Sequence, residues 1–424
     1  MESVTNELIE KGKVARIAAR KLAFTSTTIK NMALANIAKS IIDRQDEILS
    51  ANRKDLDYAK SSGIEKSMLD RIMLSPSRLE AISAGVRKIM ALPDPIGEMY
   101  DMHVAEKGLQ IGRKRVPLGV IGAIYESRPN VTIDISALCL KSGNAVILRS
   151  GKESINSSVL LAHIAQDACN QSGLAAGAIQ IIESTDHVLV DHMLKMRDMI
   201  DLIIPRGGAG LIKLIRENAT MPVIAGGIGV CHTYVDKDAD LDKAVDIIHN
   251  AKTQRPSVCN ALDCILIHEK VIENYLPVIV AKLAKDKVEL HCDEKSWDIL
   301  KDIPSLNLVK AVEEDWGKEY LSLKASIKVV SSLDGALEHI EKYGSGHSEA
   351  IISENYSTAM RFINEVDAAS VYANASTRFT DGEVFGLGAE IGISTQKFHA
   401  RGPMGLKEIT SYKWIIFGDG QIRS

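Results

Sequence analysis

The stretch VIGAIYESRPNVTIDISALCLKSGNAVILRSGKES, residues 120–154, decides the fold. Its apolar run at 120–125 predicts a short buried strand. Residues 131–141 fit a helix that a Gly-Asn pair ends, and a second strand is expected at 145–148. Strand, helix and strand in this order predict a parallel sheet with helices packed against it.

The same alternation continues on the C-terminal side of this stretch. Helices are expected at 154–171, 187–196 and 209–217, and strands at 178–182 and 202–204. A similar series follows, with helices near 240–251 and 275–283 and strands near 262–267, 327–330 and 350–352. The predicted fold class is therefore α/β, with two doubly wound domains.

The flanking regions have different patterns. Apolar residues at helical spacing run through the first ninety residues until Pro93 and Pro95, which predicts a helical layer over a sheet. Residues 99–116 alternate loosely around a Lys-Gly turn and predict a hairpin. Residues 412–417 (YKWIIF) predict another strand, which could pair with the hairpin within or between subunits. We expect these two segments to form a small β oligomerisation element.

Composition excludes several classes of protein. The 424 residues carry 51 Lys and Arg against 55 Asp and Glu, a formal net charge of −4, so no strong field for nucleic acid or anionic lipid is expected. The sequence contains no run of about 18 apolar residues, so no membrane-spanning helix is expected. The N-terminus does not resemble a secretory signal. Six scattered cysteines without a CxxC pair favour a reducing cytoplasm.

Two segments that follow predicted strands could hold a nucleotide. Residues 205–210 (PRGGAG) open a helix, and their glycines would let a phosphate approach backbone N–H groups. Residues 148–153 (LRSGKE) place two cations and a hydroxyl at the carboxyl end of a strand, where they would suit a ribose 2′-phosphate. The alternatives are an ordinary tight turn and a solvated loop. No GxGxxG follows the first strand.

Cys259 is the candidate nucleophile among the cysteines. It lies in a polar, proline-containing loop, QRPSVCN, between a predicted helix and a predicted strand. Such a place can favour a thiolate, although an unpaired cysteine is more often a buried packing residue. Packing is the preferred interpretation for Cys139, Cys231 and Cys264. The eleven histidines show no metal-ligand spacing, so no metal site is expected.

Seven segments together resemble the aldehyde dehydrogenase superfamily, and within it the gamma-glutamyl phosphate reductase family. They are YESRPNVT (125–132), LRSGKES (148–154), IPRGGAGLI (204–212), GVCHTYVD (229–236), RPSVCNALD (255–263), NASTRFTDG (374–382) and GLGAEIGISTQKFHARGPMGL (386–406). The resemblance covers nearly the whole chain from about residue 116. It implies NADPH-dependent reduction of L-glutamyl 5-phosphate to L-glutamate 5-semialdehyde with release of phosphate, the second step of proline biosynthesis.

The resemblance also implies roles for individual residues. Cys259 matches the thiol nucleophile that forms a thioester, and Asn130 matches the side-chain amide that stabilises the oxyanion. The residues expected to bind NADPH are Arg149, Ser150, Lys152, Gly207, Gly208 and Glu383. We expect the substrate to bind at Arg255, Arg378 and Arg401. Which of these three arginines binds the substrate carboxylate is left open.

The domain organisation implied by this family has three parts. Residues 1–98 and 116–232 would form the cofactor-binding domain with its helical layer. Residues 233–407 would form the catalytic domain. Residues 99–115 and 408–424 would form the oligomerisation hairpin and strand of a homodimer or a larger homo-oligomer. A channelling contact with glutamate 5-kinase is a further expectation, and no nucleic-acid or membrane partner is expected.

One departure from hydrolytic aldehyde dehydrogenases bears on the chemistry. Those enzymes carry a glutamate upstream of the cysteine that activates water, whereas residues 221–230 (MPVIAGGIGV) contain no acid. A reductase must protect its thioester from water, so this absence is expected. Two alternatives stay open at this point: an acylating aldehyde dehydrogenase that passes its thioester to coenzyme A, and a scaffold protein whose site has decayed.

Overall fold

The computed structural model describes residues 2–64, 66–226 and 228–423. The chain divides into two compact units. The first contains Met1–Ala225, Gly386–Gly392 and Met404–Ser424, and the second contains Gly226–Phe385 and Ile393–Pro403. The division falls a few residues before the expected boundary at 232/233, and the segment 386–392 belongs to the first unit.

The first unit is built on a parallel sheet. Its strands are β3 (Val120–Tyr125), β4 (Ala145–Ser150), β5 (Ile179–Ile182) and β6 (Leu202–Arg206), in the order β5-β4-β3-β6. Every residue of β3 and β4 is buried. Their sequences are continuously apolar because helices cover both faces of a parallel sheet. The strand prediction for 120–125 is confirmed, and β4 extends two residues beyond its predicted end.

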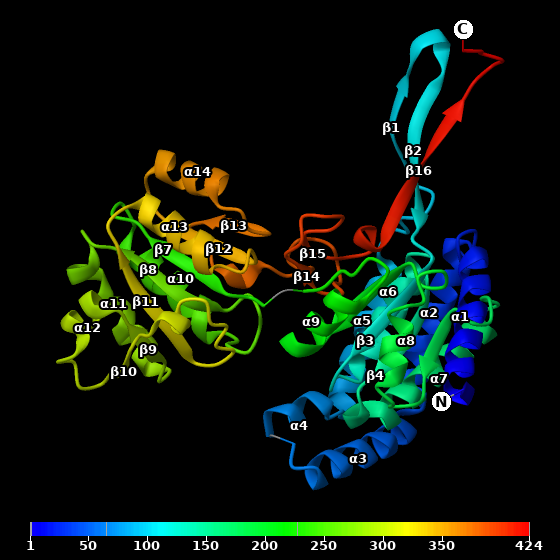
Figure 1. Cartoon of the computed structure of the whole chain (residues 1–424), viewed down its shortest axis with the longest axis horizontal. Helices are drawn as coiled ribbons and strands as arrows, with labels where there is room; N and C mark the ends of the chain where they lie inside the picture. Colours follow the sequence, from blue (N-terminus) through cyan, green and yellow to red (C-terminus); the bar gives the residue numbers. More distant parts are fainter. Residues whose placement is uncertain (1, 65, 227, 424) are drawn as a thin grey trace. The chain divides into compact units, whose positions relative to one another are not determined.

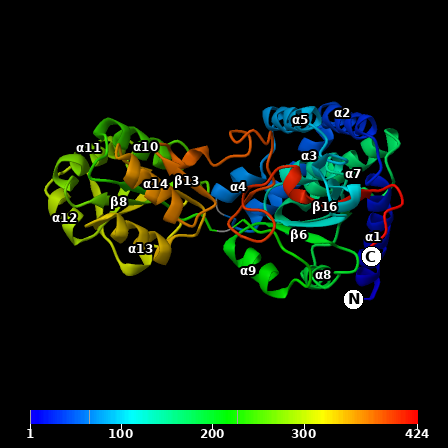
Figure 2. The same ribbon diagram turned by 90° about the horizontal axis from the view of Figure 1, so that it is seen from above.

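Helices cover this sheet in layers. They are α1 (Glu2–Leu22), α2 (Thr27–Asp43), α3 (Gln45–Ser61), α4 (Lys66–Ile72), α5 (Pro76–Ala91), α6 (Asn130–Lys141), α7 (Ile155–Gln171), α8 (Val188–Met193) and α9 (Ala209–Asn218). Helices α6 and α7 pack together against the strands, and α2 and α5 lie side by side outside them (Figure 2). The predicted helical N-terminal layer is confirmed.

A separate antiparallel sheet carries the predicted hairpin. Strands β1 (Met99–Val104) and β2 (Gln110–Pro117) pair around a turn in which Lys107 and Gly108 both have positive φ. Strand β16 (Thr410–Phe417) pairs with β2 along its whole length. The hairpin and the C-terminal strand therefore pair within one chain, as a ribbon that extends from the helical layers of its unit (Figure 1).

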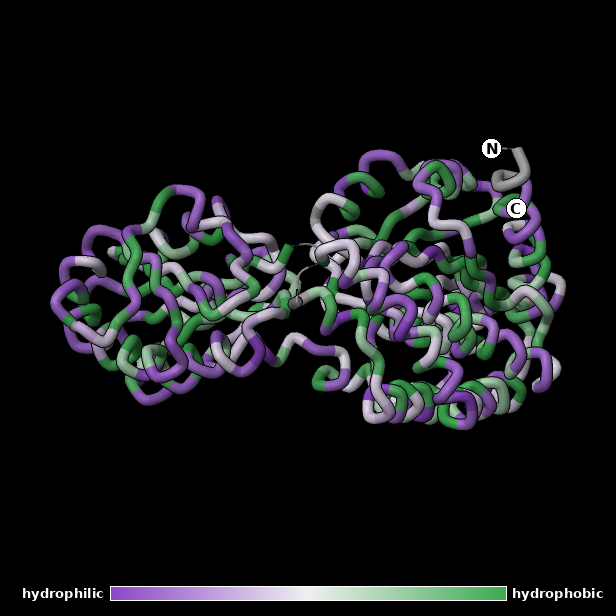
Figure 3. The backbone as a smooth tube through the Cα atoms, turned by 90° about the horizontal axis from the view of Figure 1, so that it is seen from below, coloured by the Kyte–Doolittle hydropathy of each residue, from purple (hydrophilic) through white to green (hydrophobic). Residues whose placement is uncertain are grey.

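In its described part, the second unit contains a seven-stranded parallel sheet in the order β10-β9-β11-β8-β7-β12-β13. The strands are β7 (Cys231–Val235), β8 (Leu262–His268), β9 (Glu289–Cys292), β10 (Asn307–Lys310), β11 (Lys324–Val330), β12 (Ser348–Ile352) and β13 (Ser370–Ala373). The helices are α10 (Leu241–Thr253), α11 (Ile272–Lys285), α12 (Glu294–Leu300), α13 (Leu333–Tyr343) and α14 (Tyr356–Glu365). Figure 3 shows many of its hydrophilic stretches along the outer helices and turns.

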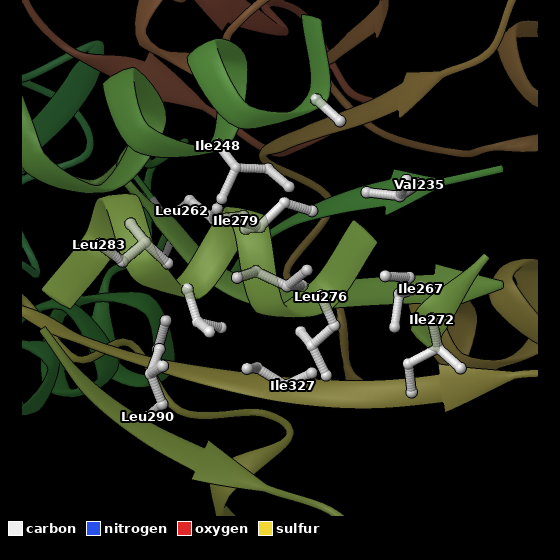
Figure 4. Close-up of a cluster of buried hydrophobic side chains, with 14 of the residues drawn as sticks. Val235, Ile248, Leu262, Ile267, Ile272, Leu276, Ile279, Leu283, Leu290 and Ile327 are labelled. Atoms are coloured by element: carbon white, nitrogen blue, oxygen red, sulfur yellow. The ribbon is translucent and has the colours of Figure 1, made fainter. Parts of the chain in front are cut away.

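Alternation along β8 assigns its side chains to two cores. Ile265 and Ile267 pack with α10 and α11, as Figure 4 shows for Ile267. Cys264 and Leu266 pack with α13 and α14. Burying one such aliphatic side chain contributes about 1.5–3 kcal/mol relative to leaving it exposed. A one-residue shift in register would exchange the two faces, so this pattern fixes how β8 sits between its neighbours.

The C-terminal segment from residue 374 to 409 is mostly irregular. Its regular pieces are the two-residue strands β14 (Ile393–Ser394) and β15 (Gly402–Pro403) and short 3-10 turns. This irregular segment is rich in glycine, a residue with few steric restrictions on its backbone. Within the described residues, no helix has both the length and the apolar character needed to cross a membrane.

Candidate active site

Three turns of the first unit meet at the carboxyl edge of its sheet. The turn after β3 carries Glu126, whose carboxylate accepts a hydrogen bond from the Gly208 N–H at 3.0 Å. The Gly151 N–H donates to the Tyr125 carbonyl at 2.8 Å. A β-carbon at Gly207 would overlap the Glu126 carboxylate, so a larger residue there would displace the Glu126 side chain. Parallel neighbouring strands bring these turns together, at the edge where ligands bind in such sheets.

Arg149 is the last residue but one of β4, and Lys152 lies in the turn that follows this strand; their surroundings differ. Arg149 is buried, its Nη2 donates to the Thr185 carbonyl at 3.1 Å, and its Nε has no partner among the described residues. Burial lowers the pKa of Arg149. Lys152 is exposed, with its Nζ 5.0 Å from the centroid of the Tyr58 ring. A buried, partly unsatisfied guanidinium beside a flexible cation suits an anionic group.

Ser150 takes a supporting position. It is buried, and its hydroxyl lies 3.2 Å from the Gly151 carbonyl oxygen and 2.9 Å from Ser158 Oγ, so it can donate its one hydrogen to either of them. These bonds fix the turn after β4 and occupy the hydroxyl inside the protein. A contact between Ser150 and a cofactor would therefore be made by neighbouring backbone rather than by this side chain.

Helix α9 begins directly after Gly207 and Gly208, and the Glu126 carboxylate lies at its N-terminus. A negative group is stable there because N–H groups point outward and the helix dipole is positive at that end. The same place would accept a phosphate. Ser127, beside Glu126, has φ 48° and a buried hydroxyl without a partner in the described structure. This combination of donors, glycines and local strain fits the anionic part of a dinucleotide.

Asn130 begins α6 at the same edge. Its Nδ2 donates to Asp134 Oδ2 at 2.8 Å, one turn further along the helix. Burial raises the pKa of Asp134 to about 6, and the hydrogen bond from Asn130 acts against that rise. The amide is therefore held in one orientation by a carboxyl group that titrates near neutral pH.

Cys259 lies in the turn that joins α10 to β8 in the second unit and is partly exposed. The other cysteines are buried, at positions 139, 169, 231, 264 and 292. Burial raises the pKa of each of these buried thiols, which keeps them protonated. Cys259 is therefore the cysteine with solvent access that nucleophilic chemistry requires.

The backbone around Cys259 is held closely by its neighbours. The Cys231 thiol donates to the Cys259 carbonyl at 3.2 Å, and a β-carbon at Gly229 would overlap that carbonyl. The Gly229 N–H in turn donates to Glu319 Oε1 at 3.0 Å. Burial raises the pKa of Glu319. Sequence reasoning missed Glu319, because no local pattern links it to a glycine 90 residues earlier.

Arg378 is fixed across the Cys259 loop. It donates to the side-chain oxygens of Gln254 and Asn260, the former at 2.8 Å. Asn260 itself donates to the Thr380 carbonyl at 2.8 Å. Burial lowers the pKa of Arg378, and the charge of nearby Arg255 lowers it further. Two neighbouring guanidiniums, one of them bonded to neutral amides, form a positive region beside Cys259.

The remaining two candidates lie in the irregular C-terminal segment. Arg401 forms an ion pair with Asp367 at 2.8 Å, which occupies part of its guanidinium. Glu383 is exposed in a turn, and its backbone N–H donates to Asp381 Oδ1 at 2.9 Å. The structure thus brings Arg255 and Arg378 near Cys259, while Arg401 has an acidic partner elsewhere in the unit.

Comparisons with known proteins agree on one family. Residues 7–299 match the model of the aldehyde dehydrogenase family. The chain is 56% identical to the gamma-glutamyl phosphate reductase of Dehalococcoides mccartyi over 423 residues, covering 100% of both chains. It is 52% identical to that of Caldanaerobacter subterraneus subsp. tengcongensis, covering 98% of this chain and 100% of the relative. It also resembles the crystal structure of the Thermotoga maritima gamma-glutamyl phosphate reductase, with TM-score 0.96, 48% identity, and coverage of 99% of this chain and 100% of that one.

Proposed function

Because the chain belongs to the aldehyde dehydrogenase family, as an oxidoreductase of its gamma-glutamyl phosphate reductase branch, we propose that it reduces L-glutamyl 5-phosphate to L-glutamate 5-semialdehyde with release of phosphate. This activity is the second step in making proline from glutamate. The observation that supports it best is the position of Cys259: the partly exposed cysteine stands in a turn beside two guanidiniums.

In the proposed reaction Cys259 acts twice. Its thiolate adds to the acyl carbon, the carbon–oxygen bond to phosphate breaks, and inorganic phosphate leaves a thioester on Cys259. A nicotinamide cofactor, when bound, would supply the hydride needed to reduce the thioester carbon. The carbon–sulfur bond then breaks, which releases the aldehyde and regenerates the thiolate. Asn130 and the backbone N–H of Cys259 are the proposed donors to the oxyanion in each addition.

The family implies a nicotinamide cofactor, and the proposed choice is NADPH. Arg149 and Lys152 would hold the ribose 2′-phosphate, because they supply one buried and one exposed cation at the carboxyl end of β4. Gly207 and Gly208 would let the pyrophosphate approach the N-terminus of α9. Glu383 is the proposed ligand of the nicotinamide ribose. Glu126 would have to leave the helix terminus when the cofactor binds there.

The substrate has two anionic groups, its phosphate and its α-carboxylate. We assign Arg378 and Arg255 to these groups in preference to Arg401, since Arg401 is already paired with Asp367. Arg378 is held by Gln254 and Asn260, so its guanidinium is positioned before substrate arrives. A positioned guanidinium loses little side-chain entropy when it binds a planar anion.

This function is tested by running the reaction in the oxidative direction and comparing two possible acceptors of the acyl group. Glutamate 5-semialdehyde and NADP are supplied with either phosphate or coenzyme A, and NADPH formation is followed. We expect turnover with phosphate and none with coenzyme A. Turnover with coenzyme A alone would favour an acylating aldehyde dehydrogenase. Failure to bind NADPH would favour a scaffold protein.

The nucleophile is tested separately by substitution. Cys259→Ala should abolish turnover and leave NADPH binding nearly intact, because the thiol acts on the acyl group and not on the cofactor. Cys292→Ala is the matched control, since Cys292 is a buried cysteine of the same unit. Substantial turnover in Cys259→Ala would refute this assignment.

The three-stranded sheet of the first unit supports a homodimer or larger homo-oligomer. Its strand β16 exposes Trp414, Ile416 and Phe417, each at least half exposed in one chain. Exposed apolar strand surfaces are normally covered by a partner.

The acyl phosphate is unstable, so we also propose that glutamate 5-kinase transfers it directly to this protein. A pull-down between the two purified proteins tests this contact.

A further inference from the structure

A row of polar side chains crosses the core of the second unit. The parallel register places His232 of β7 opposite Glu349 of β12 on one side and opposite Cys264 of β8 on the other. Ser326 of β11 continues the row beside Cys264. All four residues have no exposed surface. The interior of such a sheet is normally apolar, because an unsatisfied polar group there is costly.

His339 reaches this row from α13, which packs on the same face. Its Nε2 lies 3.7 Å from Cys264 Sγ, and its ring meets the His232 ring edge to face with centroids 5.4 Å apart. Ligand atoms of His232, Cys264 and His339 all lie within 4.8 Å of one another. Two imidazoles and one sulfur from three elements therefore converge on a small buried volume.

The hydrogen bonds at one end of the row leave specific atoms unsatisfied. Glu349 Oε2 accepts from the His232 backbone N–H at 2.8 Å and lies 3.0 Å from His232 Nδ1. With Nδ1–H donating to Glu349, Nε2 carries the lone pair. Neither His232 Nε2 nor Glu349 Oε1 has a partner among the described residues. Leaving a buried polar atom unsatisfied is energetically unfavourable.

Aromatic side chains surround the remaining sides of this cluster. The rings of Trp316 and Tyr343 enclose His339 on its other sides.

We propose that His232 Nε2, Cys264 Sγ and His339 Nε2 bind one zinc ion in the core of the second unit, apart from Cys259. Binding replaces the sulfur–hydrogen bond of Cys264 by a zinc–sulfur bond and releases one proton to solvent. The divalent ion, one thiolate and the Glu349 carboxylate then sum to zero charge, which removes the burial penalty of Glu349. Imidazole nitrogen and thiolate are the ligands that zinc prefers.

Glu349 has a separate role in this site. It would orient His232 through Nδ1 in the way that carboxylates support zinc-bound histidines, and loss of such a partner typically weakens metal binding about 10–100-fold. Zinc would also tie β7, β8 and α13 together, so it should raise the thermal stability of the whole chain by mass action.

The experiment uses full-length protein carrying Cys259→Ala, so that the partly exposed thiol cannot bind metal. After removal of metal with a chelator, zinc binding is measured by competition with a chromophoric chelator, and cobalt is added as a spectroscopic substitute. We expect one zinc per chain and a thiolate-to-cobalt charge-transfer band. Both should be lost on adding Cys264→Ala or His339→Gln, and Glu349→Gln should weaken zinc binding about 10–100-fold.

Cys292→Ala is the matched control, because Cys292 is a buried cysteine of the same unit that packs on the opposite face of the sheet. It should keep stoichiometric zinc and the cobalt band. Thermal unfolding of each metal-free variant checks that the variant folds. If Cys264→Ala or His339→Gln does not fold, the zinc affinity of Glu349→Gln tests the proposal, because this substitution hardly changes the side-chain volume. The proposal is overturned by absence of zinc binding in the parent protein, or by binding that none of the three substitutions weakens.

Discussion

Gly229 lies against the backbone of Cys259 so closely that a β-carbon on Gly229 would overlap the Cys259 carbonyl oxygen. The N–H of Gly229 is held by Glu319 at 3.0 Å, so the glycine cannot easily retreat. The position of the partly exposed cysteine thus depends on a glycine thirty residues earlier in the chain, and through it on a carboxylate from a different part of the unit.

Gly229→Ala should therefore damage activity more than stability. The added methyl group has to push the Cys259 loop outward, and a displacement near 1 Å from the productive position costs on the order of 10²-fold in rate. Overpacking should cost about 1–3 kcal/mol in the free energy of unfolding. Steady-state kinetics and urea unfolding measure the two effects. Gly335→Ala in α13 is the control, because a β-carbon there makes only ordinary contacts; wild-type rates in Gly229→Ala would contradict this account.

A second prediction concerns pH and Asp134. Burial raises its pKa to about 6 from the ordinary value of 3.8, so folding favours the protonated form. The contribution to stability is complete below pH 4 and is lost as pH rises through about 6. Asp134→Asn can still accept the hydrogen bond from Asn130 and carries no charge to bury. The variant should gain stability over wild type at pH 8, with no gain at pH 4.

Urea unfolding at the two pH values measures this difference. Asp246→Asn is the control, since the Lys282 ammonium lowers the pKa of the Asp246 carboxyl, the opposite direction. It should show no gain at pH 8. Equal effects of Asp134→Asn at both pH values would mean that the carboxyl does not titrate in this range.

Cofactor preference is the third prediction. Replacing Arg149 and Lys152 by Ala should weaken NADPH binding far more than NADH binding, because only NADPH carries the 2′-phosphate. One charge-assisted hydrogen bond contributes about 1.5–3 kcal/mol, or roughly 10–150-fold in affinity. Fluorescence titration with both cofactors gives the ratio. An unchanged ratio would place the phosphate at another site.

The fourth prediction concerns assembly. Ile416 is 55% exposed on β16, and a charge at its position would have to be buried in any interface that covers this strand. Ile416→Lys should shift a homo-oligomer toward monomer at micromolar concentration, as measured by light scattering. Phe24→Lys is the control, because Phe24 is an exposed apolar residue that does not belong to the three-stranded sheet. A wild-type chain that is already monomeric at this concentration would exclude the assembly.

How far the sequence predicted the structure depended on the element. Val120–Tyr125 was identified without error because an uninterrupted apolar run bounded by turn residues has few alternatives. Strand β7 was not identified, since CHTYV mixes polar and apolar residues and is buried on both faces. The polar partner of its His232 is Glu349 of β12, which lies 117 residues away in the sequence. Sequence spacing cannot show such partners.

The candidate site divides in the same way. Cys259, Arg378 and the glycines after β6 lie in segments that a family resemblance identifies. Glu126 and Glu319 were missed, because each acts on the backbone of a distant glycine and neither stands in a pattern with it. The cluster of His232, Cys264 and His339 was equally invisible, since neighbouring strands and one helix bring together residues without metal-ligand spacing.

The most direct test of the proposed chemistry is the amount of NADPH formed in the absence of phosphate. Residues 221–230 contain no carboxylate that could activate water, and general-base assistance is commonly worth about 10²–10⁴-fold. With glutamate 5-semialdehyde and NADP alone, the thioester on Cys259 should therefore persist. We predict a burst of about one NADPH per active site, after which almost no further NADPH forms. Adding phosphate should start steady turnover. Steady phosphate-independent turnover with glutamate as product would contradict an acyl-phosphate reductase and would point to water activation, for which Glu319 is the first residue to replace.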